Sequence, residues 1–165
     1  MKSLLLVRHA KSDWGDNTVK DFDRELNLRG RRTAPKMANH LKVDGFMPDL
    51  ILSSPAQRAK CTTRHIMEQL DFDTDKLLFE NDIYEASVRV LLRIINELPD
   101  NCDTVALVGH NPSLSYLAEL ITEENIGNIP TFGVVKINFD FGQWKMVSQA
   151  TGELEYFIYP KMFDY

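Results

Sequence analysis

The fold is decided at Leu4-Leu5-Leu6-Val7-Arg8-His9, where a short apolar run ends in an arginine and a histidine. A continuous apolar run without alternation is typical of a strand that is buried on both faces of a parallel sheet. Four apolar residues before a charge are too few for the apolar segment of a secretory signal, which needs about 7–15. We therefore expect a central strand at residues 4–7, with Arg8 and His9 just beyond its carboxyl end.

Beyond this strand, strand and helix signals alternate along the chain. Helical spacing of apolar residues and the dipeptides Ser54-Pro55 and Asn111-Pro112 mark the helices. Pro35 is expected to kink or restart the first helix, because it lacks an amide donor. The alternation predicts an α/β fold with a mostly parallel sheet and a late antiparallel edge. The expected strands are residues 49–53, 77–79, 104–108, 134–140, 143–147 and 154–159, and the expected helices are residues 28–42, 55–70, 88–98 and 112–121.

Length and composition indicate one globular domain covering residues 1–165. With 44% hydrophobic and 26% charged residues, the chain can bury a substantial core. The formal net charge of −5 argues against binding to nucleic acid or to anionic lipid. No run approaches the ~18 apolar residues of a membrane span. The two cysteines are too few for a disulfide framework. We expect a cytoplasmic protein with no nucleic-acid or membrane partner.

Reactive side chains stand just past three of the buried strands. Arg8 and His9 follow the first strand, Arg58 lies early in the helix after the second, and His110 follows the strand at 104–108. Ligands of parallel α/β sheets bind beyond the carboxyl ends of the strands. Two imidazoles, two guanidiniums and two helix N-termini suit a small, highly charged anion, and phosphate is the natural candidate. A histidine that is neutral at one ring nitrogen can attack phosphorus and form a phosphoenzyme.

Other chemistry has little support in the sequence. No stretch matches the glycine-rich loop of nucleotide-binding enzymes. The aspartates at 71–75 follow an amphipathic helix rather than a buried strand, so we expect a solvated loop and not a magnesium site. The prediction is therefore no cofactor and no metal. The polar stretch at 10–25 is longer than most connections and is a candidate functional loop.

Taken together, these motifs resemble the signature of the histidine phosphatase superfamily, which includes the cofactor-dependent phosphoglycerate mutases. The similarity extends over nearly the whole chain and is greatest to the small SixA-type phosphohistidine phosphatases. The resemblance implies a three-layer αβα sandwich of the phosphoglycerate mutase-like kind. The stretches that carry it are residues 6–14, 23–26, 29–32, 53–59, 83–86 and 108–112, with Trp144 and residues 159–160 near the end.

The same resemblance implies roles for individual residues. His9 corresponds to the nucleophile that becomes phosphorylated, and Arg8, Arg58 and His110 correspond to the residues that bind the phosphoryl group. Glu85 lies in the region where mutases and many related phosphatases place a general acid, so it is the candidate acid here. The phosphate-binding residues inferred from the strand ends are thus the same residues that the family comparison points to.

Two departures from the mutase pattern narrow the expected function. Ala10 stands where mutases have a glycine after the histidine, and Gly15 stands where they have an asparagine near the phosphate. The chain also lacks room for the insertions that cover a mutase site, which implies an open pocket.

We expect a metal-independent phosphohydrolase with a phosphohistidine intermediate, acting on a phosphohistidine of a signalling or phosphorelay protein. A phosphatase of small phosphomonoesters, such as sugar or nucleotide phosphates, is the alternative within enzymes. A non-catalytic phosphate-binding module is the other alternative, and the intact His9 disfavours it.

Overall fold

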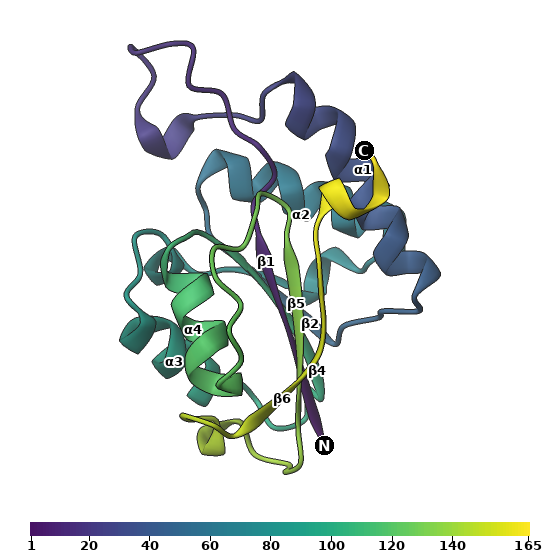
Figure 1. Ribbon diagram of the computed structural model, residues 1–165, viewed down its shortest axis with the longest axis vertical. Coiled ribbons are helices and arrows are strands. Elements are labelled where there is room, and N and C mark those ends of the chain that lie inside the picture. The colour runs from purple at the N-terminus through teal and green to yellow at the C-terminus, as the bar shows by residue number, and fades with distance from the viewer.

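The computed structural model describes residues 1–165 and contains one six-stranded sheet between two pairs of helices (Figure 1). The strand order is β3-β2-β4-β1-β5-β6. The first four strands in this order run parallel to one another, β5 runs antiparallel to β1, and β6 runs antiparallel to β5. The expected three-layer αβα sandwich with an antiparallel edge is confirmed. The strands are β1 (Lys2–Arg8), β2 (Leu50–Ser53), β3 (Leu77–Phe79), β4 (Thr104–Gly109), β5 (Val134–Phe139) and β6 (Gly152–Ile158), and the helices are α1 (Leu28–Val43), α2 (Gln57–Leu70), α3 (Val88–Asn96) and α4 (Ser113–Thr122).

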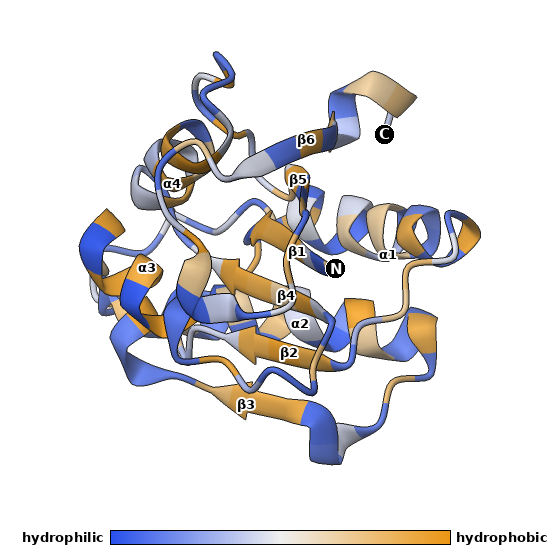
Figure 2. Ribbon diagram, turned by 90° about the horizontal axis from the view of Figure 1, so that it is seen from below, coloured by the Kyte–Doolittle hydropathy of each residue, from blue (hydrophilic) through white to orange (hydrophobic).

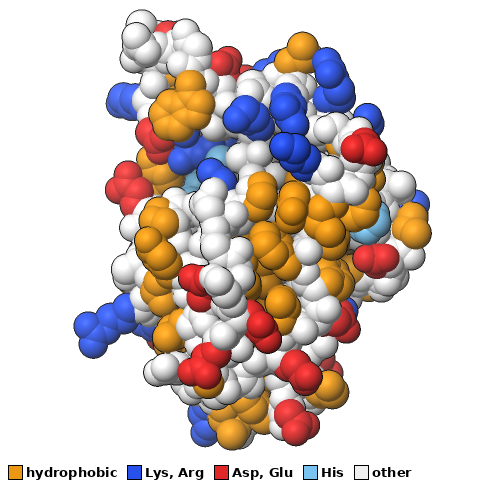
Figure 3. Space-filling view, viewed as in Figure 1, with side chains coloured by type: hydrophobic (Ala, Val, Ile, Leu, Met, Phe, Trp, Pro, Cys, Tyr) orange, Lys and Arg blue, Asp and Glu red, His pale blue; other side chains and the backbone are white.

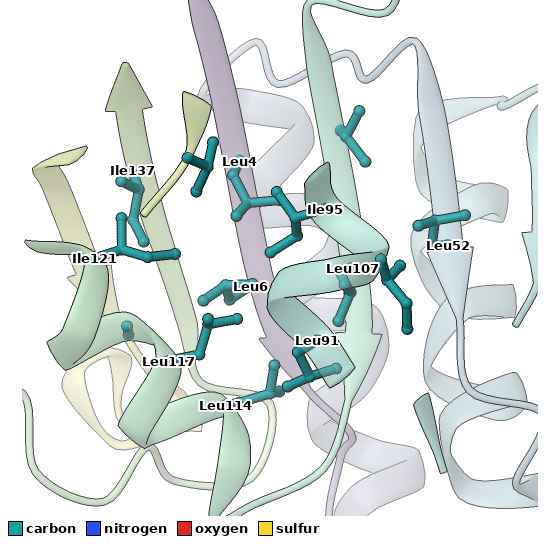
Figure 4. Close-up of a cluster of buried hydrophobic side chains, with 14 of the residues drawn as sticks. Leu4, Leu6, Leu52, Leu91, Ile95, Leu107, Leu114, Leu117, Ile121 and Ile137 are labelled. Atoms are coloured by element: carbon teal, nitrogen blue, oxygen red, sulfur yellow. The ribbon is translucent and has the colours of Figure 1, made fainter. Parts of the chain in front are cut away.

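The two faces of the sheet carry separate apolar cores. Successive residues of a strand point to opposite faces, so Leu5 and Val7 pack with α1 and α2, whereas Leu4 and Leu6 pack with α3 and α4. Figure 2 shows one helix pair on each side of the sheet, and Figure 4 shows the side chains of α3 and α4 meeting those of the strands. Because both faces are covered, β1 is apolar at consecutive positions instead of alternating, as the sequence indicated.

The predicted strand at residues 143–147 is wrong. A turn of 3-10 helix, Trp144–Met146, occupies this place. The Trp144 side chain is fully buried, and its indole N–H donates to the carbonyl of Cys102 at 2.7 Å. The side chain of Asn96 donates to the carbonyls of Trp144 and Val147, both at 2.9 Å. These side-chain bonds satisfy backbone groups that a strand would have paired with a neighbouring strand.

The helix boundaries differ in part from the expected ones. α1 continues through Pro35 without a break, so the expected restart is wrong, while the expected kink stays a prediction. α2 begins two residues after Pro55, and no side chain caps it; the Ser54 hydroxyl instead accepts from the N–H of Ala56 at 3.2 Å. Ser87 caps α3, since its side chain accepts from the N–H of Val90 at 3.2 Å. None of the helices combines the length and the apolar character that crossing a bilayer requires.

The connections of β1 and β4 create the crevice that holds the site. These two strands are neighbours in the sheet, with Arg8 opposite Gly109. The chain leaves β1 toward α1 on one face and leaves β4 toward α4 on the other face. Neighbouring parallel strands whose connections leave in opposite directions open a crevice at their carboxyl ends, which is where such sheets bind ligands.

Candidate active site

A cavity of about 300 Å³ lies at the carboxyl edge of β1 and β4. The structure brings together in it four residues that the sequence pointed to, which are Arg8, His9, Arg58 and His110. The two imidazole rings are 5.2 Å apart between their centroids. We call this cavity the histidine pocket. A larger hollow of about 570 Å³ between α2 and β3 contains none of these residues, so size alone does not locate the chemistry.

His9 is held at both its backbone and its ring. Its N–H donates to the carbonyl of Gly109 at 3.1 Å, and its carbonyl accepts from the N–H of Phe132 at 3.0 Å. Ring atom Nδ1 lies 2.7 Å from the carbonyl oxygen of Ala10. A carbonyl oxygen only accepts, so Nδ1 carries the proton and Nε2 keeps a lone pair. Arg58 Nε donates to that lone pair at 3.3 Å.

The surroundings of His9 keep its ring neutral. Burial is the main cause, and the nearby His110, Arg58 and Arg8 act in the same direction. Together they lower the pKa of His9 to about 3, although its hydrogen bond to the backbone at Ala10 favours the protonated form. A neutral imidazole with an unprotonated Nε2 is the form that attacks phosphorus.

His110 and Arg8 each have a buried nitrogen without a partner. His110 Nε2 is 2.7 Å from the Ser54 hydroxyl, but its Nδ1 makes no hydrogen bond. Arg8 donates to the carbonyl of Ile129 at 2.8 Å through one Nη, while its Nε is unpaired. Buried polar atoms without partners are rare in native proteins. Two in one cavity indicate a site for an anion with several acceptor oxygens.

Arg58 is fixed by Asp21 before any ligand arrives. Its Nη1 donates to the Asp21 carbonyl at 2.6 Å, and its Nη2 lies 3.1 Å from the carboxylate. The Tyr84 hydroxyl donates to the same carboxylate at 2.6 Å. Burial opposes ionisation of Asp21, but the bonds from Tyr84 and Arg24 and the charge of Arg58 prevail and lower its pKa to about 2. Asp21 is therefore ionised at neutral pH.

The carboxylates near the histidine pocket differ from those that the sequence pointed to. Asp21 lines the histidine pocket but was not singled out from the sequence; the signal was its position three residues before Arg24, with which it forms an ion pair at 3.0 Å. Glu85 is exposed and does not line the pocket, although it directly follows Tyr84. Its backbone is in the left-handed region, with φ 58°. Its role as an acid stays a prediction.

Comparisons with known proteins identify the family of this chain. The family model of the histidine phosphatase superfamily (branch 1) matches residues 4–89. A protein of Mycobacterium tuberculosis is 30% identical over 165 residues, covering 94% of this chain and 100% of that protein. A chloroplast protein of Arabidopsis thaliana is 32% identical over 134 residues, which are 76% of this chain and 61% of that longer protein.

Structural similarity is also high. A crystal structure from Agrobacterium tumefaciens, provisionally assigned as the phosphohistidine phosphatase SixA, superposes with a TM-score of 0.83 at 28% identity. The superposition covers 96% of this chain and 98% of that chain. The residues matched by the family model include Arg8, His9 and Arg58. The chain therefore belongs to the histidine phosphatase superfamily, branch 1.

Proposed function

We propose that this protein is a phosphohistidine phosphatase that removes the phosphoryl group from a histidine of another protein. His9 is the nucleophile, and Arg8, Arg58 and His110 bind the phosphoryl oxygens. The support is the neutral ring of His9, with its Nε2 lone pair facing the guanidinium of Arg58 at 3.3 Å. The similarity to the Agrobacterium tumefaciens structure points to the same substrate class.

The proposed reaction has two steps. In the first, Nε2 of His9 attacks phosphorus, a new P–N bond forms, and the P–N bond to the substrate imidazole breaks. In the second, water attacks phosphorus, the bond to His9 breaks, and inorganic phosphate leaves. Arg8 and Arg58 stabilise the negative charge on the phosphoryl oxygens in both steps, together with the unpaired Nδ1 of His110 when it is protonated.

One observation favours phosphohistidine over a phosphomonoester: the histidine pocket has no carboxylic acid in position to protonate a leaving group. Asp21 is the one carboxyl group that lines it, and its low pKa keeps it ionised. Glu85 is exposed outside the lining. An alkoxide leaving group is a strong base and needs a proton in the transition state, whereas the imidazole of phosphohistidine is far less basic and can already be protonated.

The test is a turnover panel on the purified protein. The substrates are a phosphohistidine peptide and three small phosphomonoesters: p-nitrophenyl phosphate, 3-phosphoglycerate and glucose 6-phosphate. We expect kcat/KM to be highest for the peptide. If 3-phosphoglycerate or glucose 6-phosphate is hydrolysed faster than the peptide, the protein is a small-molecule phosphatase. Binding of phosphate without turnover of any substrate would assign it to non-catalytic modules.

A further inference from the structure

Four exposed cations form a strip beside the histidine pocket: Lys11, Arg29, Arg32 and Lys161, which we call the basic strip. Lys11 lines the histidine pocket and also an adjoining cavity of about 160 Å³ that it shares with Arg29 and Lys161. Arg29 also lines the next hollow, together with Arg32. Figure 3 shows Lys and Arg side chains gathered in the upper part of this face, over the start of α1. The strip thus leads outward from the site across the surface.

The basic strip is held in place by the backbone around Lys11. The carbonyl of Lys11 accepts from the N–H of Asn27, the N-cap of α1, at 3.0 Å. A side chain at Gly30 would collide with that carbonyl, because an ideal Cβ there would lie 2.1 Å from the oxygen. The glycine therefore allows the first turn of α1, which carries Arg29, to pack against the segment that follows His9. The backbone that carries Lys11 and Arg29 is thus packed next to His9.

The cations of the strip have no partners within the protein. None of the four is in an ion pair, whereas Arg31 on the same helix pairs with Glu25. No carboxylate side chain lines either of the two outer hollows, although the whole chain is acidic, with 24 Asp and Glu against 19 Lys and Arg. Positive charges near the start of a helix are also unfavourable with respect to its dipole. Folding therefore gains little from these charges, which is expected if they serve an anionic partner.

The histidine pocket is also bordered by an exposed aromatic ring. Trp14 lines the histidine pocket and is 73% exposed. The guanidinium of Arg24 lies 3.5 Å from the centre of its ring. Tryptophan is enriched at the energetic centres of protein interfaces, and the buried Arg24 supports the ring of Trp14 from beneath. A small phosphorylated molecule in the pocket does not extend to Arg32, which lies two hollows away. A protein bound over the pocket can contact both the basic strip and Trp14.

From these observations we infer that the basic strip and Trp14 form the docking surface for the substrate protein, whose phosphohistidine is flanked by acidic residues. This inference rests on the proposed function. The carboxylates of the partner face the strip while its phosphohistidine enters the pocket, and apolar atoms of the partner cover Trp14. Long-range attraction of this kind raises the association rate and is weakened by salt.

The test compares three phosphohistidine probes: a peptide with glutamates flanking the phosphohistidine, a peptide with serines there, and the free amino acid. The variant is Arg29→Glu/Arg32→Glu, and the matched control is Lys76→Glu/Lys145→Glu, which changes the net charge equally at exposed, unpaired positions at the other end of the sheet. We expect the first variant to lower kcat/KM for the glutamate peptide about 10-fold or more at low salt. The serine peptide and the free amino acid should change less than about 2-fold, since the strip does not reach them. The control should leave all three rates unchanged.

Salt and stability provide two further readouts. Raising the ionic strength should lower kcat/KM of the wild type for the glutamate peptide and have little effect on the double variant. The melting temperature of Arg29→Glu/Arg32→Glu should be unchanged or higher, because acidic residues are favourable near a helix start. If the variant loses its preference for the glutamate peptide over the serine peptide but keeps its melting temperature, the loss comes from weaker docking and not from a destabilised fold.

The outcomes distinguish this inference from the proposed function. If the wild type hydrolyses no phosphohistidine probe, the proposed function fails, and this inference fails with it. Equal kcat/KM on glutamate and serine peptides, with no salt dependence, overturns the docking surface and leaves the proposed function standing. If the variant instead loses turnover of 3-phosphoglycerate, which carries a carboxylate, the strip is a small-molecule subsite and the docking surface is again overturned.

Discussion

The histidine pocket and the basic strip are both positively charged, but they differ in how their charges are held. In the pocket, His9 and Arg58 are each only 6% exposed, and Arg58 is fixed by Asp21. In the strip, the cations are exposed and unpaired. Buried, preorganised charges act strongly because little solvent screens them, whereas exposed charges act more weakly through water and are screened further by salt. Changes in the pocket should therefore lower kcat on every substrate, and changes in the strip should alter only the choice among substrates.

The largest effect is expected from His9→Ala. Removing the nucleophile should abolish turnover of every substrate and leave the fold intact, because the change lies at a strand end. During turnover the wild type should carry phosphate that is labile in acid and stable in alkali, and the variant should carry none. His65→Ala, on α2 and outside the histidine pocket, is the control. Retention of most activity by His9→Ala would falsify the proposed nucleophile.

Arg58→Ala should have the next largest effect. If Arg58 is a preorganised donor to the phosphoryl group, its loss should lower the stabilisation of the transition state by at least ~2–3 kcal/mol, as when one oxyanion donor is removed. The measurement is kcat on the phosphohistidine peptide, with Arg64→Ala on the exposed side of α2 as the control. Full activity of Arg58→Ala contradicts the proposed mechanism.

Glu85→Gln tests whether the exposed carboxylate joins the pocket when an ester is bound. The change keeps the shape and removes the titrating group. If Glu85 is the acid for esters, turnover of 3-phosphoglycerate should fall about 10²-fold or more, and turnover of phosphohistidine should fall much less. Equal losses on both substrates would indicate a role that does not depend on the leaving group. Unchanged rates would reduce Glu85 to a surface carboxylate.

The smallest expected effect is on the titration of the two histidine rings in the pocket. The low pKa values of about 3 for His9 and about 4 for His110 arise mainly from burial. The ring NMR signals of both residues should therefore stay constant between about pH 6 and about pH 8, where an ordinary histidine titrates. Because the unfolded chain binds more protons at these positions, they should lower the free energy of unfolding as the pH falls below about 6.5. A ring that titrates near pH 6.5 would contradict the neutral nucleophile.

The site could be predicted from the sequence where it depends on strand ends. Arg8 ends the buried strand β1, His9 directly follows it, and His110 directly follows β4. Neighbouring parallel strands bring their carboxyl ends to one edge. Arg58 is the second residue of α2, which begins four residues after the end of β2, so the same geometry places it there. The positions of these residues relative to the strands were sufficient to predict the site, because the backbone of the sheet determines where they lie.

Other features depend on contacts between distant parts of the chain. Asp21 reaches Arg58 across 37 residues and Tyr84 across 63, and no local pattern records such pairs. Residues 143–147 have apolar positions that suit a strand, but the burial of Trp144 against Cys102, 42 residues away, gives a 3-10 turn. Tertiary contacts overrode local preference at these places.

The contact between Asp21 and Arg58 also bears on how the pocket is emptied. Inorganic phosphate carries the same oxygens as the transferred group, so a pocket of unpaired cations would retain its own product. In the proposed reaction, the Asp21 carboxylate, oriented by Tyr84 at 2.6 Å, would compete with phosphate for the guanidinium of Arg58. A departing phosphate would then leave Arg58 with a partner already in place, which would weaken product inhibition and prepare the pocket for another turnover.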